Sequence, residues 1–307
     1  MIYTLTLNPA VDIEYQVKSF DLNSVTRASS CRMDAGGKGF NVSRMLAQLD
    51  MVSTAVGFIG GHSGARLEAA LKRQKIETNF CDITGESRTN VSFVREGSSD
   101  HYKVNDPGPE ISAFEVASLY EKVSRLALPG DWWILAGSVP PGVPLTVYAE
   151  LIRLLKQKGA QVFLDSSGEA FKLACSAQPT LIKPNLEEAE ELLGLSKGHG
   201  LSLKEISQKL IQLGPEKVVI SLGKDGACCF DGSSLNIVKS PNIVEKNPVG
   251  AGDSLVAGMV WGLFQGDALP IALKKGIACG AATASIEGTG LGTLEQVQQL
   301  MARVDVQ

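Results

Sequence analysis

The chain has 307 residues, of which 44% are hydrophobic and 20% charged, and its formal net charge is -4 at pH 7. This composition is typical of a globular enzyme of one or two domains, and the acidic balance argues against nucleic acid as the main partner, since binding a phosphate backbone requires a basic face. No apolar run is long enough to span a membrane, no secretory signal begins the chain, and the six scattered cysteines lack metal-ligand spacing, so we expect a cytoplasmic protein with free thiols.

Strand-like apolar runs alternate with helical patterns along most of the chain. The expected strands are Tyr3–Leu7, Thr54–Phe58, Trp132–Ala136, Gln161–Asp165, Leu181–Lys183 and Lys217–Leu222. The expected helices between them are Asn41–Leu49, Ser63–Gln74, Ala113–Arg125, Pro144–Lys158, Glu187–Leu193 and Leu203–Leu213. This alternation predicts a single α/β domain over residues 1–307, with helices on both faces of a mostly parallel sheet. In such sheets ligands bind at the carboxyl ends of the strands.

Two segments interrupt the alternation. Residues Val11–Ala35 and Phe80–Asn105 read as short strands with polar turns and no helix between them. We expect them to form a small β lid, outside the main sheet, over its carboxyl edge. The alternative is an antiparallel extension of the main sheet with no functional role. Charged residues next to glycine motifs in both segments favour the lid.

The first strand ends in Asn8-Pro-Ala-Val-Asp12. A carboxylate such as Asp12 accepts two hydroxyl hydrogens and therefore suits a polyol, although a turn capped by Asn8 and Asp12 would explain the same residues. Next comes Gly36-Gly37-Lys38-Gly-Phe-Asn41 at the entry to the first long helix. It lacks the spacing of a P-loop or a dinucleotide fingerprint.

That glycine cluster has two interpretations. Gly36 and Gly37 can let the backbone approach a sugar, with Lys38 and Asn41 offering hydrogen bonds. The alternative is an ordinary glycine-rich helix entry.

Further along, Lys183-Pro-Asn185-Leu-Glu-Glu188 follows a buried strand. Asn185 is expected to cap the next helix. The spacing also puts Asn185 and Glu188 on neighbouring positions of the first turn, where they could organise water around a magnesium ion.

The loop Ser221-Leu-Gly223-Lys-Asp-Gly226 joins two strands. Its glycines are either simple hairpin glycines or part of a nucleotide-binding loop.

The most informative motif is Asn247-Pro-Val-Gly250-Ala251-Gly252-Asp253-Ser254, which opens an apolar helix. Glycines permit a sharp turn, and the first helical turn directs unpaired N–H groups and the positive dipole end into one space. That arrangement predicts a phosphate site. Asp253 fits there as a general base for an attacking hydroxyl, and the alternative is an Asp N-cap after a glycine turn.

The motifs occur in this order across nearly the whole chain, and the set resembles the PfkB/ribokinase family of carbohydrate kinases. Its details, among them Ala136-Gly-Ser138-Val-Pro-Pro-Gly142 and Arg88-Thr-Asn90, are most similar to the phosphosugar branch of 1-phosphofructokinases and tagatose-6-phosphate kinases. The resemblance implies a ribokinase-like, three-layer αβα Rossmann-like core with a β lid that can form a homodimer interface. It also implies ATP and Mg²⁺ as cofactors. Because no apolar run could span a bilayer, we expect no membrane partner.

By the same resemblance, the chain phosphorylates a ketohexose phosphate, with fructose 1-phosphate going to fructose 1,6-bisphosphate. Asp253 is then the base, the backbone of residues 250–253 forms an anion hole, and Arg88 grips the acceptor phosphate. The expected substrate-binding residues are Asn8, Asp12, Gly36, Gly37, Lys38, Asn41, Arg88, Ser138 and Asp253. The expected ATP-binding residues are Lys183, Asn185, Ser221, Gly223, Gly226 and Gly252, with Asn185 and Glu188 holding Mg²⁺ through water.

Three alternatives stay open at this point. One is tagatose-6-phosphate kinase activity, which uses a related ketose phosphate. Another is a sugar-phosphate sensor that has lost catalysis, which the intact Gly250–Asp253 motif disfavours. The third, a nicotinamide dehydrogenase, is disfavoured because no GxGxxG follows the first strand.

Overall fold

The computed structural model of the protein describes residues 1–19, 23–97, 101–196, 198–288 and 290–305. Within these residues the main sheet has nine strands in the order β13-β12-β11-β10-β9-β8-β1-β4-β5. In chain order they are β1 (Ile2–Thr6), β4 (Thr54–Ile59), β5 (Glu77–Asp82), β8 (Trp132–Ala136), β9 (Gln161–Asp165), β10 (Leu181–Ile182), β11 (Val218–Ser221), β12 (Ala227–Phe230) and β13 (Leu235–Val238). In this spatial order, the seven neighbouring strands from β11 across to β5 run parallel. At the other end, β12 pairs antiparallel with β11, and β13 pairs antiparallel with β12. The predicted, mostly parallel sheet is therefore confirmed.

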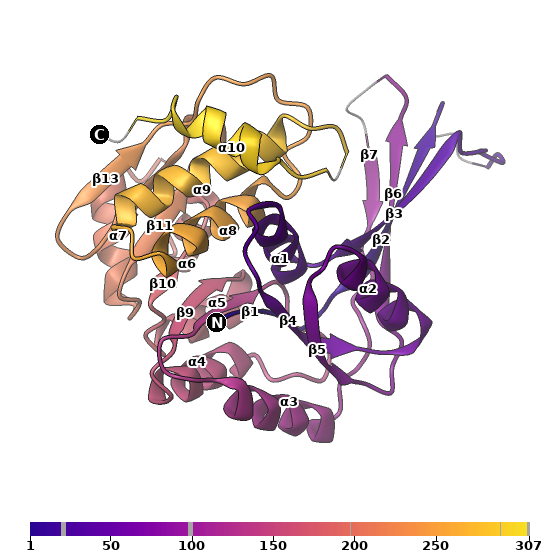
Figure 1. The fold of residues 1–307 in the computed structure, drawn as a ribbon, viewed down its shortest axis with the longest axis horizontal. Helices are drawn as coiled ribbons and strands as arrows, with labels where there is room; N and C mark the ends of the chain where they lie inside the picture. Colours follow the sequence, from indigo (N-terminus) through magenta and orange to yellow (C-terminus); the bar gives the residue numbers. More distant parts are fainter. Residues whose placement is uncertain (20–22, 98–100, 197, 289, 306–307) are drawn as a thin grey trace.

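Helices cover both faces of this sheet, as Figure 1 shows. One layer contains α1 (Lys38–Gln48), α2 (Gly61–Arg73), α8 (Ala251–Phe264), α9 (Leu269–Ala284) and α10 (Leu294–Met301). The other contains α3 (Ala113–Leu126), α4 (Val147–Gln157), α5 (Gly168–Cys175), α6 (Leu186–Leu192) and α7 (Leu203–Gln212). Side chains of a strand point alternately to the two layers. Accordingly Cys228 belongs to the core beneath α3–α7, and Cys229 to the core beneath α1 and α8–α10.

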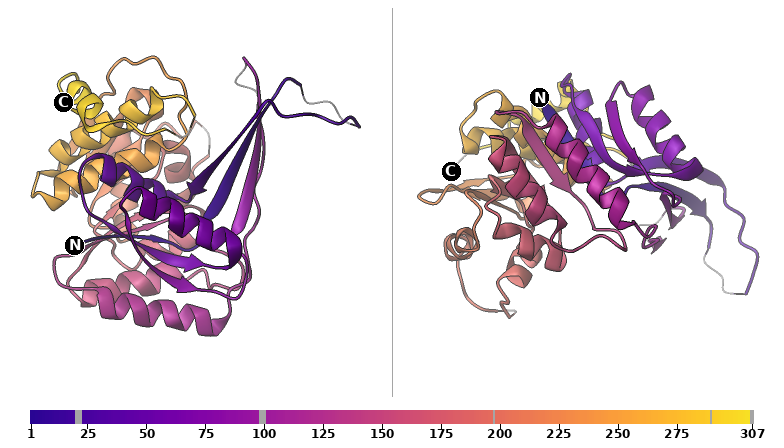
Figure 2. Two further views of the ribbon diagram at one scale, coloured as in Figure 1. Left: turned by 45° about the vertical axis from the view of Figure 1, so that its right-hand side comes forward. Right: turned by 90° about the horizontal axis from the view of Figure 1, so that it is seen from below.

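A separate four-stranded sheet, with the order β3-β2-β6-β7, stands away from this three-layer body (Figures 1 and 2). Its strands are β2 (Ala10–Val17), β3 (Ser30–Gly36), β6 (Arg88–Arg95) and β7 (His101–Val104). The predicted strands outside the main sheet are therefore confirmed, and the alternative of an extension of the main sheet is excluded. We call these four strands the second sheet.

One boundary of the predicted lid is wrong. The lid was expected to include Phe80 onward, but residues 80–82 belong to β5, where Phe80 pairs with Gly57 and Asp82 with Ile59 of β4. The cause is that β5 is a short edge strand of the main sheet whose half-buried pattern looks like that of a lid strand. Two parts of the predicted lid segments, residues 20–22 and 98–100, lie outside the described residues.

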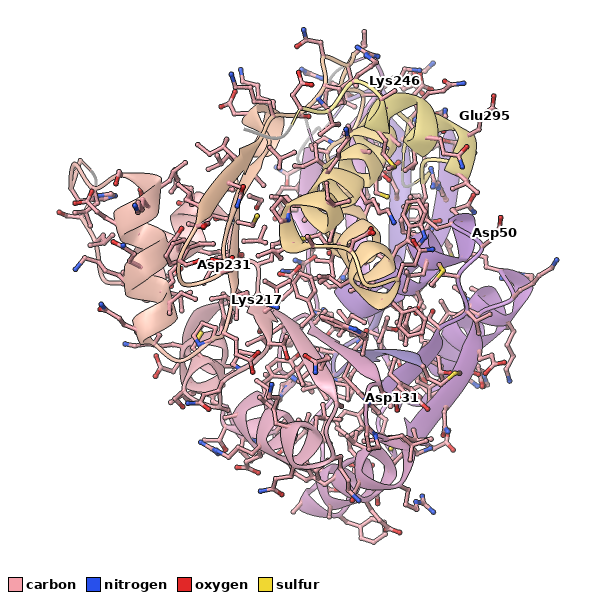
Figure 3. The ribbon with its side chains drawn as sticks, turned by 60° about the vertical axis from the view of Figure 1, so that its left-hand side comes forward. Asp50, Asp131, Lys217, Asp231, Lys246 and Glu295 are labelled. Atoms are coloured by element: carbon pink, nitrogen blue, oxygen red, sulfur yellow. The ribbon has the colours of Figure 1, made fainter. Side chains whose placement is uncertain are left out.

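Polar residues gather at the edge of the main sheet formed by the carboxyl ends of its parallel strands. Asn8, Ser138 and Lys183 come just beyond the carboxyl ends of β1, β8 and β10, and Ser221 is the last residue of β11. Asp131 and Lys217, labelled in Figure 3, directly precede β8 and β11 and so mark the opposite, amino-terminal edge. Most of the predicted site residues therefore share the edge at which parallel sheets bind ligands.

Six free cysteines lie in the described residues, five of them buried and Cys31 exposed. In the same part of the chain, every helix is too short or too polar to cross a membrane.

Candidate active site

The start of α8 is shaped by a glycine turn. Gly250, the N-cap, has φ 79°, in the left-handed region where glycine carries no penalty. The amide of Ala251 donates to the carbonyl of Pro248 (3.1 Å), so this member of the expected anion hole is already engaged within the turn. The amides of Gly252 and Asp253 have no partner within α8, because the first amides of a helix lack intrahelical acceptors. Together with the helix dipole they favour an anion at this end of α8.

Asp253 lies in the first turn of α8 and is 8% exposed. Its Oδ2 accepts a hydrogen bond from Asn41 Nδ2 at 2.8 Å. Burial, reinforced by the negative charge of Asp165, raises the pKa of Asp253 to about 6, against the opposing effects of Asn41, Lys38 and Lys183. A carboxylate with this pKa is ionised at neutral pH and can still accept a proton readily, as a general base requires.

Asp165, at the end of β9, forms ion pairs with two lysines near Asp253. Its carboxylate pairs with Lys38 Nζ at 2.9 Å and with Lys183 Nζ at 3.3 Å, and it is 1% exposed. Burial opposes ionisation, but the two lysines together hold the pKa of Asp165 below its ordinary value. Burial lowers the pKa of Lys38. The attraction of Asp165 outweighs this effect, and the pKa of Lys38 rises to about 12. Asp165 and Lys38 therefore stay charged at neutral pH.

The second of these lysines reaches the start of α8. A Cβ added at Gly252 would lie 3.9 Å from Lys183 Nζ, so the ammonium group is beside the helix N-terminus. Lys183 and the α8 amides thus contribute positive charge to the same space, next to the carboxylate of Asp253. This combination can bind an anion and remove a proton beside it.

Asn185 and Glu188 form the predicted cap. The Asn185 side chain accepts from the amide of Glu188, and Glu188 Oε2 accepts from the amide of Asn185, each at 2.8 Å. Glu188 also raises the pKa of Lys38 electrostatically, after the larger effects of burial, Asp165 and Asp253, so α6 begins near the charged cluster. Glu188 Oε1 takes no part in the cap.

The loop between β11 and β12 lies beside that cap. Ser221 forms a β-bridge with Asn185, and its amide donates to the carbonyl of Pro184 at 3.0 Å. Gly223 and Gly226 have φ 61° and 102°, and a side chain at Gly226 would overlap the carbonyl of Val238. The geometry of the hairpin therefore accounts for both glycines, and a nucleotide-binding role for this loop stays a prediction.

A cavity of about 570 Å³ lies at the base of the second sheet. Among its lining residues are the predicted Asn8, Arg88 and Ser138. Arg88 donates from Nε to the carbonyl of Asn8 (3.1 Å) and from Nη1 to the carbonyl of Asp106 (2.8 Å), which fixes the guanidinium in the cavity wall. Asn8 Oδ1 is buried beside the backbone of Gly108 without a hydrogen-bond partner in the described residues.

The cavity adjoins the charged cluster through the loop after β8. Gly137, which precedes Ser138, donates its amide to the carbonyl of Asp165 at 3.0 Å. A Cβ at Gly137 would lie 4.0 Å from Lys38 Cβ. The cavity wall and the lysine–aspartate cluster are thus adjacent, joined by Gly137.

Asp12 and Gly36 face each other where the second sheet meets α1. Asp12 Oδ1 accepts from Asn90 Nδ2 at 2.8 Å, and a side chain at Gly36 would overlap the Asp12 carboxylate. Gly37 is the N-cap of α1 with φ 131°. The glycines thus allow close approach to a carboxylate and a sharp helix entry, and their predicted contact with a sugar stays a prediction.

Three polar residues of this site were not predicted from the sequence: Asp165, Asn90 and Arg44. Asp165 ends a buried parallel strand, which was a usable signal at the carboxyl edge. Asn90 meets Asp12 through the register of β2 with β6, and Arg44 meets Asn41 within α1. Neither of the latter contacts has a sequence signature.

Comparison with known proteins gives a consistent result. The sequence model of the pfkB family carbohydrate kinases matches residues 5–296. The chain is 37% identical over 306 residues to 1-phosphofructokinase of Bacillus subtilis, covering 100% of this chain and 99% of that protein. It is 34% identical over 309 residues to tagatose-6-phosphate kinase of Staphylococcus epidermidis, with coverage of 100% and 99%.

Among solved structures, phosphofructokinase-2 from Escherichia coli in complex with potassium is similar, with a TM-score of 0.93, 29% identity and 98% coverage of both chains. The tetrameric inhibited form of that enzyme has a TM-score of 0.91 at 29% identity, again with 98% coverage of both chains.

Proposed function

The chain belongs to the pfkB family of carbohydrate kinases, and from this premise we propose that it transfers a phosphoryl group from ATP to fructose 1-phosphate. The product is fructose 1,6-bisphosphate. The observation that carries the proposal is the buried carboxylate of Asp253 beside the N-terminus of α8 and the ammonium of Lys183. The identity to a 1-phosphofructokinase supports the choice of sugar phosphate. Tagatose 6-phosphate is the second candidate, supported by the 34% identical relative.

The proposed reaction transfers one proton to Asp253 and one phosphoryl group to the sugar. Asp253 takes the proton of the 6-hydroxyl, whose oxygen attacks the γ-phosphorus as the bond to the β-phosphate oxygen breaks. That bonding pair leaves with ADP. The amides of Gly252 and Asp253 and the Lys183 ammonium stabilise the charge on the transferred group, which is the main form of catalysis available to phosphoryl transfer.

Asn185 and Glu188 are the residues proposed to hold Mg²⁺. Their side chains are shared with the helix cap, which leaves Glu188 Oε1 as a carboxylate oxygen outside it. In the described residues no three His, Cys, Asp or Glu side chains come together in a metal-binding group. A contact through water therefore fits this donor set better than a cage of protein ligands, since Mg²⁺ keeps several waters. When bound, the ion supplies positive charge to the phosphates of ATP.

The remaining assignments follow the two halves of the site. We assign ATP to the side with Lys183, Asn185, Ser221, Gly223, Gly226 and Gly252. We assign the sugar phosphate to the side with Asn8, Asp12, Gly36, Gly37, Lys38, Asn41, Arg88 and Ser138. The acceptor phosphate lies against Arg88, because a guanidinium held by two backbone carbonyls presents its remaining N–H groups in a fixed direction.

We further propose a cytoplasmic homodimer formed through the second sheet. That sheet has two edge strands, β3 and β7, and exposes Met33, Tyr102 and Val104 at 53%, 63% and 49%. Unpaired edges with apolar side chains are candidates for pairing with a second copy. The tetrameric relative supports assembly in general, and the free cysteines support a reducing compartment.

A coupled kinase assay tests the function. It compares fructose 1-phosphate, fructose 6-phosphate and tagatose 6-phosphate at equal ATP and magnesium. We expect the highest kcat/KM with fructose 1-phosphate. A higher kcat/KM with tagatose 6-phosphate would move the assignment to the second candidate, and no turnover with any of the three would favour the sensor.

A further inference from the structure

Arg44 is a buried cation whose contacts lead to the proposed base. It lies on α1, one turn after Asn41, and is 9% exposed. Its Nη1 donates to Asn41 Oδ1 at 3.2 Å and its Nε to Gln74 Oε1 at 3.3 Å, at the end of α2. Asn41 Nδ2 in turn donates to Asp253 Oδ2 at 2.8 Å. One chain of hydrogen bonds thus runs from α2 through α1 to α8.

The chemistry of the three groups fixes the direction of that chain. A guanidinium only donates, an ionised carboxylate only accepts, and a carboxamide has one end of each kind. Asn41 therefore fits between Arg44 and Asp253 in one orientation, with its oxygen toward the guanidinium. If the amide turned over, its NH₂ would face the guanidinium and its oxygen would face the carboxylate, so both hydrogen bonds would become repulsive contacts.

We propose that Arg44 is a positioning residue for phosphoryl transfer: by locking the Asn41 amide, it holds the Asp253 carboxylate aimed and ionised for proton abstraction. The inference rests on the proposed role of Asp253 as the base. It gives Asn41 a contact with the base in addition to any contact with the sugar.

The groups around Asp253 determine whether its pKa rises or falls when Arg44 is replaced. Around Asp253 these are Asp165 on β9, Lys38 on α1 and Lys183 after β10. The hydrogen bond from Asn41 lowers the pKa of Asp253, against burial and Asp165, which raise it. Loss of the lock therefore moves that pKa upward.

Arg44 has its own charged neighbours. Burial lowers its pKa, and Asp34 and Asp12, on β3 and β2, favour its charged form, while Arg32 on β3 opposes it. Because a guanidinium stays protonated in proteins, its charge is present across the working pH range.

A purely structural role would look different. Arg44 also joins α1 to Gln74 at the end of α2, and loss of that bridge alone would lower stability. It would leave the pH dependence of turnover unchanged. The pH profile therefore separates the two roles.

The test compares Arg44→Met with the wild type and with Arg66→Met, a matched control at an exposed arginine of α2. We expect kcat for Arg44→Met to fall about 10- to 100-fold, the range for a lost hydrogen bond to a charged group, with a much smaller change in KM for ATP. The acid limb of kcat/KM should move up by about one pH unit. The substrates' phosphates titrate in the same range, so the shift is taken as the difference between the variants.

Arg44→Lys and a double-mutant cycle complete the test. Lysine keeps the charge without the planar fork, so its kcat and acid limb should lie between those of the wild type and Arg44→Met. In an Asn41→Ala background, Arg44→Met should cost less than about 2-fold in kcat, because its effect passes through Asn41. Should Arg44→Met fail to fold, Arg44→Lys alone decides the matter.

Wild-type kcat and an unmoved acid limb in Arg44→Met, or in Arg44→Lys where only that variant folds, would overturn the inference. So would an undiminished Arg44→Met effect in the Asn41→Ala background. Asp253→Asn, measured alongside, separates the two proposals. If it abolishes turnover while Arg44 variants stay normal, the positioning role alone is wrong, and if it turns over normally, the proposed base is wrong.

Discussion

Asn41 Nδ2 lies 2.8 Å from Asp253 Oδ2, although the two residues are 212 positions apart in the chain. The contact joins the first turns of α1 and α8, two helices that pack side by side on one face of the sheet. Each helix begins with a glycine N-cap at positive φ, Gly37 and Gly250. The two tight entries bring the helix starts together, and the proposed base receives its hydrogen bond from the helix that carries Lys38.

The raised pKa of Asp253 predicts that the site costs stability. Because its pKa in the fold is about 6, above the ordinary 3.8, folding favours the protonated carboxyl. The cost of ionising it is fully present above about pH 6, shrinks as the pH falls toward 3.8, and is absent below that value. A neutral carboxamide in place of the carboxylate avoids this cost, so Asp253→Asn should be more stable than the wild type by up to ~3 kcal/mol at about pH 8.

Urea unfolding of both proteins at about pH 8 and about pH 4 measures this difference. The stability gain should nearly vanish at the lower pH. A variant less stable than the wild type at the higher pH would contradict the raised pKa.

Asp165→Asn should have the opposite effect on the base. Removing the Asp165 charge takes away a negative charge that raises the pKa of Asp253, and it leaves unpaired the Lys38 and Lys183 ammonium groups, which lower that pKa. The acid limb of kcat/KM should therefore move to lower pH, in contrast to the upward shift expected for Arg44→Met. Lys183 is buried, so the free energy of unfolding should fall by about 3–5 kcal/mol, as when one partner of a buried ion pair is removed. An acid limb that moves up would contradict the electrostatic account.

Arg88→Ala should affect the two substrates unequally. If Arg88 binds the acceptor phosphate, KM for the sugar phosphate should rise at least about 10-fold, since a hydrogen bond between charged groups contributes about 1.5–3 kcal/mol. KM for ATP should change far less. Steady-state kinetics with each substrate varied in turn measures this, with Arg125→Ala at an exposed site on α3 as the control. Equal increases in both KM values would remove the acceptor-phosphate role.

The proposed homodimer predicts a specific effect at the second sheet. Sedimentation at micromolar concentration should give the mass of two chains. Met33→Lys, at an exposed position of edge strand β3, should give one, because a charge in the shared apolar layer is not compensated. Phe114→Lys, at an 81% exposed position on α3, should remain dimeric. A fully active wild-type monomer would reject the dimer.

The sequence predicted the parallel sheet well where local patterns decide the structure. The expected bounds of the strands Trp132–Ala136 and Gln161–Asp165 agree with those of β8 and β9, because long apolar runs between turn residues have few alternatives. The assignment of residues 80–82 failed, since membership of an edge strand depends on pairing with β4 rather than on composition.

The site divides in the same way. Gly250 and the Asn185 cap were readable, because turn and cap residues act within a few positions. The pairing of Asp165 with Lys38 spans 127 positions, and that of Asn41 with Asp253 spans 212. Such contacts depend on the order of strands in the sheet and on helix packing, which no local pattern specifies.

The central claim is that Asp253 removes the proton from the acceptor hydroxyl, and Asp253→Asn tests it most directly. The measurement is the single-turnover rate of phosphoryl transfer from ATP to fructose 1-phosphate, with circular dichroism to establish that the variant is folded. The account predicts a rate at least about 10²- to 10⁴-fold below that of the wild type, with only a modest change in KM for either substrate. A folded Asp253→Asn variant that transfers phosphate at a near-normal rate would contradict it.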